Sequence, residues 1–210
     1  MRVSKQKAAE NRERILRSAA RLFRENGIGA TGVDSITEDA GLTHGGLYSH
    51  FGSKEAIAAE AIRFALVRGK RRWQRALERN PGERALPAIV DGYLSPAHRD
   101  APGNGCVVAA LGTDIARQPR RVRQAFTKEI KEDLEFFSRL MAKGDRSRSY
   151  ENAIVAFASM AGALILARAV NDEALSDLIL KSTAERVIKG ARVRKAVRPA
   201  RVTTTKIKES

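Results

Sequence analysis

The chain contains few of the residues that build disulfides, metal sites and aromatic cores. Among 210 residues there are one cysteine and three histidines, and aromatic residues make up 5%. A single cysteine cannot form an intramolecular disulfide, and the Cys and His residues lack the spacing of a zinc site. The fold therefore depends on apolar packing. Its 43% hydrophobic and 30% charged residues are ordinary proportions for a globular protein.

Long apolar runs and enzyme motifs are also absent. No uninterrupted apolar stretch approaches the roughly 20 residues of a membrane span, and the first residues lack the apolar core of a signal peptide. We therefore expect a cytoplasmic protein with no membrane partner. The sequence has no G-x-S-x-G elbow, P-loop, G-x-G-x-x-G or H-E-x-x-H motif. It predicts neither an enzyme nor a bound cofactor or metal.

Positive charge is in large excess. The formal net charge is +15, of which residues 189 to 210 carry +7 through eight Lys or Arg residues and one Glu. Such an excess favours polyanionic partners such as DNA. The basic segment 190–210 has no helical apolar stripe, so we expect a disordered tail. It either adds nonspecific DNA affinity or is only solvated.

The apolar residues recur at helical spacing along most of the chain, and no segment shows the alternation of a strand. We predict an all-α protein of about nine helices in two unequal parts. The expected domains are 8–54 and 55–189, followed by the tail. The expected helices cover 8–26, 31–40, 44–50, 53–77, 84–95, 106–117, 120–142, 149–170 and 173–189.

The second and third of these helices form the pattern of a helix-turn-helix. They are short, they are joined by the turn Gly41-Leu42-Thr43, and a longer helix follows them after Ser53. In this motif the second short helix lies in the major groove of DNA. Ser53 and Thr43 stand at N-cap positions, and Gly27 is suited to a left-handed C-terminal cap.

The segment Thr31–Ile57, TGVDSITEDAGLTHGGLYSHFGSKEAI, resembles the N-terminal signature of the TetR family of bacterial transcriptional regulators. The resemblance is specific over residues 10 to 60 and architectural beyond them. It implies an N-terminal three-helix DNA-binding domain and a C-terminal helical domain for ligand binding and dimerisation. The protein would be a homodimeric repressor of double-stranded, pseudopalindromic operator DNA, released by an effector that the sequence does not identify.

The resemblance also implies which residues contact DNA. The start of the recognition helix would approach base edges, whereas tyrosine, histidine and lysine would contact phosphates. Without the motif, such a tyrosine would more often belong to a core and such a histidine to an ordinary surface. The expected DNA-binding residues are Thr31, Gly32, Val33, Thr43, His44, Gly45, Gly46, Tyr48, His50 and Lys54.

Two further sets of residues follow from the family's architecture. The last two long helices would form the dimer interface, because the first is rich in small residues that let helices approach closely. Large apolar residues of the middle helices would line an effector cavity, although most of them could equally be core. The expected interface residues are Ala153, Phe157, Met160, Ala161, Leu164, Leu175, Leu178 and Ile179. The expected effector residues are Cys106, Phe64, Trp73, Tyr93, Leu111, Phe126 and Phe157.

Cys106 has two interpretations. It follows Gly105 and opens a predicted helix, where the helix dipole lowers a thiol pKa and favours the reactive thiolate. The segment is similar to the Gly-Cys motif of electrophile- and oxidant-responsive repressors of the TetR family. The alternative is a small residue that only packs. In the first case, operator release would follow thiol modification as well as binding of an apolar or aromatic effector.

A different class of protein also fits the charge. An architectural or constitutive DNA-binding protein without an effector would be equally basic. It would not need the long helical region that follows the helix-turn-helix. We therefore favour a regulator whose effector changes the spacing of two recognition helices.

Overall fold

The computed structural model describes residues 5–141 and 146–192, and all regular structure in these ranges is helical. This confirms the all-α prediction. The α-helices are α1 (Lys5–Asn26), α2 (Val33–Asp39), α3 (His44–Phe51), α4 (Lys54–Arg79), α5 (Ala85–Tyr93), α6 (Pro96–Arg99), α7 (Val107–Ala116), α8 (Arg120–Met141), α9 (Arg146–Ala169) and α10 (Glu173–Arg192). Two 3-10 turns, η1 (Gly82–Arg84) and η2 (Pro102–Asn104), complete the structure.

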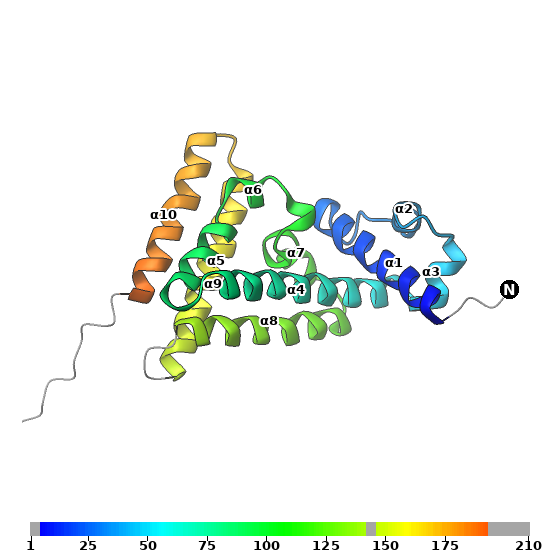
Figure 1. Ribbon diagram of the computed structural model, residues 1–210. Helices are drawn as coiled ribbons and strands as arrows, with labels where there is room; N and C mark the ends of the chain where they lie inside the picture. The colour runs from blue at the N-terminus through cyan, green and yellow to red at the C-terminus, as the bar shows by residue number, and fades with distance from the viewer. Residues whose placement is uncertain (1–4, 142–145, 193–210) are drawn as a thin grey trace, which may run out of the picture.

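The helices form an elongated molecule with α4 along its length (Figure 1). Helices α1, α2 and α3 gather at one end, where α4 begins. Helix α8 runs beside α4, and α9 and α10 form the opposite end. The loops and short helices between α5 and α7 lie where the two ends meet. This arrangement places the helix-turn-helix far from the last two helices.

The helix-turn-helix forms for the local reasons that its sequence suggests. Ile15, Ala19 and Phe23 turn the apolar face of α1 into the core. Gly27 ends the helix with a φ of 86°, and Gly41 makes the turn after α2 with a φ of 60°. Both angles lie in the left-handed region that glycine adopts without steric cost. The bends after α1 and α2 therefore follow from glycine placement.

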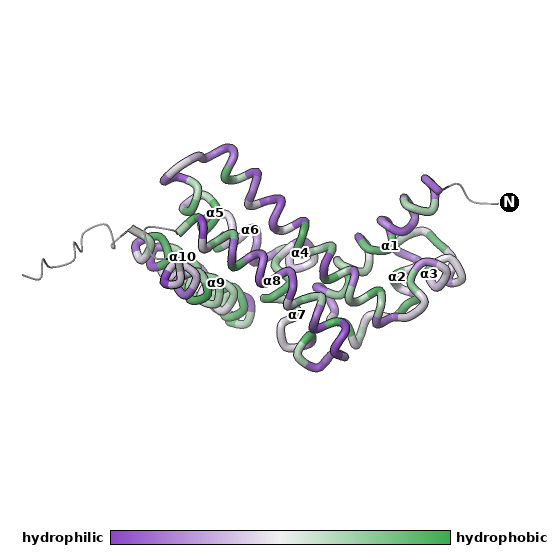
Figure 2. The backbone as a smooth tube through the Cα atoms, turned by 90° about the horizontal axis from the view of Figure 1, so that it is seen from below, coloured by the Kyte–Doolittle hydropathy of each residue, from purple (hydrophilic) through white to green (hydrophobic). Residues whose placement is uncertain are grey.

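Two clusters of buried apolar side chains hold the molecule together. The first joins α1, α2, α3 and the first half of α4 to α7 and the start of α8, with Ile57, Leu111 and Val122 at its centre. The second joins α5, the end of α8, α9 and α10 around Phe137 and Met160. Helix α4 contributes to both clusters. Figure 2 shows hydrophobic and hydrophilic residues alternating along the helices.

The structure corrects several boundaries. Helix α6 was missed, although Ser95 is its N-cap and accepts a hydrogen bond from the His98 backbone N–H, and Pro96 occupies the first turn. Helix α10 continues to Arg192, three residues into the expected tail. The rest of that tail, residues 193–210, lies outside the described residues.

Helix α9 contains the most apolar long segment of the described chain. By length and composition alone, Ser147–Ala169 could cross a membrane. Here one face of the helix packs within the protein, because Ala153, Met160 and Leu164 have no exposed surface. Helix α9 is therefore a central helix of the second core in this structure.

A matched pair of cap variants tests this local analysis. The Ser53 hydroxyl accepts a hydrogen bond from the Ala56 N–H at 3.1 Å, whereas Thr43, the N-cap of α3, makes no side-chain cap bond. The expected capping bond of Thr43 is therefore absent. We expect Ser53→Ala to lower the free energy of unfolding by about 1 kcal/mol. Thr43→Ala should change it by much less. Urea unfolding at one protein concentration measures both; equal losses would contradict the assignment.

Candidate DNA interface and effector cavity

Helix α3 presents its first turns to solvent. Thr43, His44 and Gly45 are exposed, and Tyr48 is 42% exposed although its size would favour burial. The rings of His44 and Tyr48 meet edge to face at 5.1 Å. His44 Nε2 also lies 3.2 Å from the carboxylate of Asp34 on α2. The surface expected to read DNA is thus free of intramolecular cover.

The other expected DNA-binding residues are placed less uniformly. Gly32 is exposed at the N-terminus of α2, while Val33 and Gly46 are partly buried. Lys54 is partly buried, and its ammonium group donates a hydrogen bond to the Gly29 carbonyl at 3.2 Å. His50 is half-buried beside the Phe51 ring.

Thr31 corrects the expectation for this interface. Only 2% of the residue is exposed, and its hydroxyl donates to the Gly27 carbonyl at 2.7 Å. The side chain thus closes the connection between α1 and α2. Because hydroxyl and methyl are both enclosed, Thr31 positions α2 and its side chain is not available to DNA.

A cavity of about 340 Å³ opens between α4, α5 and the loop before α7. Four of the seven expected effector residues line it, namely Cys106, Trp73, Tyr93 and Phe157. The Trp73 indole packs edge to face on the Phe157 ring at 6.1 Å. Apolar and aromatic walls of this kind are typical of small-molecule sites.

The other three expected effector residues lie elsewhere. Leu111 is 2% exposed and belongs to the first core, and Phe126 packs against that core. Periodicity could not separate these two from cavity residues, because a wall and a core both select apolar side chains. Phe64 lines a different, arginine-rich cavity between α1 and α4.

His98 is a cavity residue that the sequence did not reveal. Its Nδ1 lies 2.6 Å from the Tyr93 carbonyl, and its Nε2 accepts the Cys106 backbone N–H at 2.9 Å. These partners require a neutral ring with the proton on Nδ1. Burial lowers the His98 pKa, and nearby Arg168 and Arg72 act in the same direction. The neutral ring therefore fixes the loop before α7.

Cys106 borders the cavity, but its environment differs from the expected one. It is the N-cap of α7 and is half-buried. Burial raises the pKa of the Cys106 thiol, and this outweighs the Tyr93 hydroxyl and the backbone N–H groups of Val108 and Ala109, which favour the thiolate. The expectation of a lowered thiol pKa is therefore wrong, because desolvation exceeds the effect of the helix terminus.

A second polar group of the cavity comes from α8. Asp133 is 1% exposed, and the Lys70 ammonium lies 3.6 Å from its carboxylate. Burial raises the Asp133 pKa to about 7, and the neighbouring Glu129 adds to this, while Lys70 opposes it. One sequence signal was available, since Glu129 and Asp133 share the apolar face of α8 with Phe136 and Phe137.

The loop that bounds the cavity also touches the first helix. Arg24 of α1 donates from Nε to the Gly103 carbonyl at 2.9 Å and from a second nitrogen to the same oxygen. A Cβ on Gly103 would overlap the Glu25 carboxylate, so a larger residue there would require the Glu25 side chain to move. Asp114 of α7 also accepts the Ile28 N–H at 3.0 Å. The cavity wall and the DNA-binding end are thus bonded to each other.

Comparison with known proteins agrees with this geometry. The family model described as bacterial regulatory proteins, tetR family, matches residues 15–61. An uncharacterized HTH-type transcriptional regulator of Mycobacterium tuberculosis is 29% identical over 178 residues, which cover 80% of this chain and 89% of that protein. The HTH-type transcriptional repressor KstR2 of Mycolicibacterium smegmatis is 34% identical over 95 residues, covering 44% of this chain and 46% of the repressor.

A solved TetR-family regulator from Cytophaga hutchinsonii has the same fold, with a TM-score of 0.73 and 21% identity over 90% of this chain and 98% of that one. The chain matches the TetR family model over residues 15–61 and is similar to HTH-type transcriptional regulators over most of its length. It is therefore a DNA-binding transcriptional regulator and not an enzyme. TetR-family regulators bind operator DNA, typically as dimers.

For a TetR-family dimer, the structure revises the expected interface. Ala153, Phe157, Met160, Ala161 and Leu164 are at most 5% exposed within the single chain, so they belong to its own core. Ile179 is partly buried, whereas Leu175 and Leu178 are exposed as expected. The large apolar residues left exposed on α9 and α10 are Ile154, Val155, Ile165, Leu166, Leu175 and Leu178. Periodicity did not separate the face of α9 that is buried in the single chain from the face that is exposed.

The buried acid of this cavity predicts a pH dependence. Because the folded chain holds the Asp133 proton up to about pH 7 and the unfolded chain releases it near 3.8, stability falls as pH rises through this range. We expect the melting temperature of the wild type to fall between pH 5 and pH 8, and Asp133→Asn to remove much of that fall. Asp91→Asn, at an exposed position of α5, is the control. An unchanged pH slope in Asp133→Asn would contradict the prediction.

Proposed function

We propose that the protein is a homodimeric repressor of a pseudopalindromic operator, released when a small apolar or aromatic molecule occupies the cavity around Trp73. Because such a repressor binds chromosomal DNA, it would be located in the cytoplasm. Two recognition helices on one symmetric particle would match half-sites one helical turn apart. Domains 8–54 and 55–189 would divide DNA binding from effector binding and dimerisation.

The exposed end of the helix-turn-helix supports the DNA contacts in this proposal. His44, Gly45 and Gly46 would face base edges, where two glycines permit close approach of the backbone. Tyr48, with its exposed ring, would contact phosphate. The remaining contacts would come from Gly32, Val33, Thr43, His50 and Lys54.

The observation that carries the release mechanism is the bonded path from cavity to DNA-binding end. The Cys106 N–H is bonded to His98 in the cavity wall, and the same loop is bonded to Arg24 of α1 through Gly103. A ligand that shifts this loop would therefore shift α1 and the recognition helix with it. A coupling of about 1–3 kcal/mol would lower operator affinity roughly 5- to 150-fold.

Modification of Cys106 is a second route to the same change. The thiol borders the cavity, and an adduct there would occupy space next to Tyr93 and His98. The raised Cys106 pKa favours the thiol form at neutral pH, which reacts slowly with electrophiles. Ligand binding is therefore the better-supported route, and a purely packing role for Cys106 remains compatible with it. The cavity itself favours a regulator over an architectural DNA-binding protein.

Arginine substitutions on the exposed face of α9 and α10 test the dimer. Val155 is 65% exposed and Leu178 is 57% exposed, so burial within the single chain does not account for their apolar side chains. We expect Val155→Arg/Leu178→Arg to give a folded monomer whose operator affinity falls roughly 100-fold or more, because the two half-sites are no longer bound by one particle. Light scattering and fluorescence anisotropy on an operator selected from random duplexes measure these quantities. The control is Thr113→Arg, at an exposed position of α7. A double variant that remains dimeric would refute this interface.

Filling the cavity tests the effector site. Gly69 lines the cavity, and a Cβ there meets no atom within 4 Å, so Gly69→Leu should fold while its side chain enters the cavity. Trp73 is the only tryptophan and reports on binding. We expect the neutral dye N-phenyl-1-naphthylamine to quench Trp73 in the wild type and to bind Gly69→Leu about tenfold more weakly or worse.

Gly112→Leu is the matched control, because Gly112 is equally open but lies on α7 outside the cavity. It should bind the dye as the wild type does. Operator binding without dye should be the same in all three proteins. Equal dye affinity in Gly69→Leu and Gly112→Leu would place the dye elsewhere and remove support for this cavity.

A further inference from the structure

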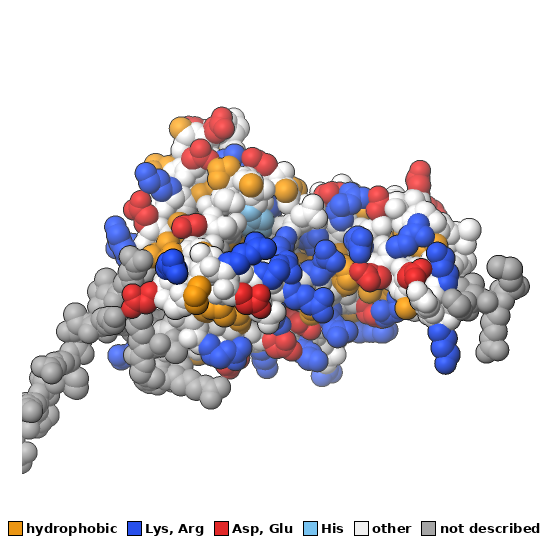
Figure 3. All heavy atoms as spheres, in the orientation of Figure 1, with side chains coloured by type: hydrophobic (Ala, Val, Ile, Leu, Met, Phe, Trp, Pro, Cys, Tyr) orange, Lys and Arg blue, Asp and Glu red, His pale blue; other side chains and the backbone are white. Residues whose placement is uncertain are grey.

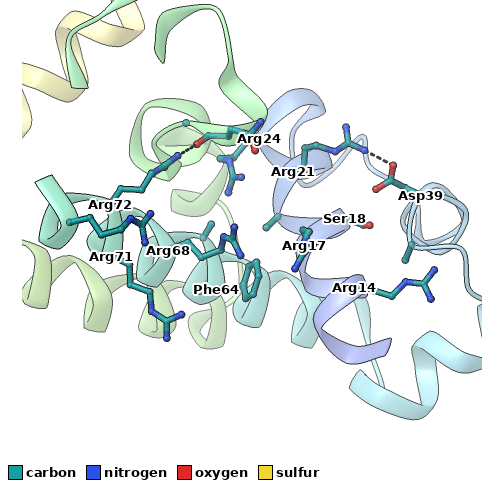
Figure 4. Close-up of a pocket in the computed structure, with 16 residues that line it drawn as sticks. Arg14, Arg17, Ser18, Arg21, Arg24, Asp39, Phe64, Arg68, Arg71 and Arg72 are labelled. Atoms are coloured by element: carbon teal, nitrogen blue, oxygen red, sulfur yellow. Dashed lines mark hydrogen bonds and ion pairs between the residues drawn. The ribbon is translucent and has the colours of Figure 1, made fainter. Parts of the chain in front are cut away.

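A second cavity, of about 510 Å³, lies between α1 and α4, and arginines line both of its sides. We call it the arginine groove. Helix α1 provides four of these side chains and α4 the other four, and Asp39 is the only acidic residue in the lining. Figure 3 shows Lys and Arg side chains gathered along this face, and Figure 4 shows arginines of both helices around the groove, with Arg21 turned toward Asp39. The arginines are Arg14, Arg17, Arg21, Arg24, Arg68, Arg71, Arg72 and Arg75.

Most of this charge is not neutralised within the described chain. Arg21 is paired with Glu25 and Asp39, and Arg17 with Glu13. None of the other six forms an ion pair with a described carboxylate. Like charges brought together without counter-charges are expected to attract an anion.

Two of the arginines are held in place before any ligand arrives. Arg24 is fixed by its two bonds to the Gly103 carbonyl, and Arg72 donates to the Asn104 carbonyl at 2.6 Å. The remaining nitrogen of Arg24, Nη1, is buried and has no hydrogen-bond partner. Burial and then the neighbouring Arg72 lower the Arg24 pKa to about 10, so the group stays charged at neutral pH. Guanidinium groups that are held in place and charged in this way are suited to binding phosphate oxygens.

The position of the groove argues for a small ligand rather than for the DNA backbone. The α4 arginines that line the groove begin at Arg68, and the DNA-binding end of α4 is at Lys54, about 20 Å away at the rise of an α-helix. A duplex seated on α3 would reach the first turn of α4 and not the fourth. The groove is also hollowed, whereas a DNA backbone is met by an exposed ridge or surface.

We propose that the arginine groove binds a small polyanion that carries at least two phosphate groups. Its phosphates would bridge the guanidinium groups of α1 and α4. The groove adjoins the apolar cavity, since Ala65, Arg72, Asn104 and Gly105 line both. The ligand would therefore tie α1 to the same loop that bounds the effector cavity. The site is separate from Gly69, Trp73 and Phe157, so it does not depend on the proposed effector.

Inorganic tripolyphosphate is the probe, and calorimetry on the full-length protein at constant ionic strength measures its binding. We expect one saturable site per protomer, with inorganic monophosphate binding much more weakly. Arg68→Gln/Arg71→Gln should weaken tripolyphosphate binding at least about tenfold, because two charge-assisted contacts are lost. Both side chains are exposed, so thermal stability should not change.

Arg121→Gln/Arg123→Gln on the exposed start of α8 removes the same charge outside the groove and should leave the affinity within about twofold of the wild type. Arg68→Lys/Arg71→Lys keeps the charge but loses the planar donors, and it should bind with intermediate affinity. If Arg68→Gln/Arg71→Gln and Arg121→Gln/Arg123→Gln weakened tripolyphosphate binding equally, the loss would follow from net charge alone. That result would overturn the proposal. Loss of operator binding in Arg68→Gln/Arg71→Gln with intact tripolyphosphate binding would instead assign these residues to DNA.

Discussion

The hydrogen bonds between Arg24 and the Gly103 carbonyl join the two ends of this molecule. Residues 102 to 105 pass between α1 and the cavity, and they do so closely because glycine stands at two of the contact points. A side chain at Gly103 would overlap Glu25, and one at Gly105 would lie 2.8 Å from His98. The loop thus has one face toward the DNA-binding end and one toward the cavity. A displacement on either face is passed to the other through the hydrogen bonds that the loop makes with Arg24 and His98.

The packing of α1 beside α4 brings two sets of arginines together. On α1 and α4, taken separately, the arginines occupy the polar faces of amphipathic helices and would be solvated without consequence. When the helices pack side by side, these faces border a common groove, and the separate charges become one concentrated field. Solvent screening keeps the cost to stability small for the exposed members. Arg24 is different, because burial removes much of its water, and carbonyl oxygens replace that water only in part.

Buried acidic groups on α8 are also incompletely compensated. Glu129 and Asp133 lie on the apolar face of α8, and Lys70 of α4 reaches both at 3.5 and 3.6 Å. Lys70 also lies 2.6 Å from Glu132, and Arg63 lies 3.6 Å from Glu129. Burial is the main cause of the raised Asp133 pKa, and Glu129 adds to it, while Lys70 opposes it. This acid beside apolar walls gives the cavity a polar group that could orient a ligand.

The amino-acid sequence by itself determined the all-α class, the long helices and the helix-turn-helix, because these depend on spacing within one segment. Apolar residues at helical period, Gly27, Gly41 and Ser53 act on their immediate neighbours, and the TetR signature lies within one continuous stretch. The short helix α6 was missed because a single turn contains no period. Only the tertiary structure decided which apolar residues are wall, core or exposed face, as Phe157, Leu111 and Val155 show.

It also decided that Cys106 is desolvated, that His98 bonds to the loop, and that the arginines of α1 face those of α4. The physical reason is that burial, dielectric environment and hydrogen-bond partners come from residues far apart in the chain. Helical periodicity states that a side chain is apolar or charged. Which neighbours that side chain then meets depends on how the helices pack.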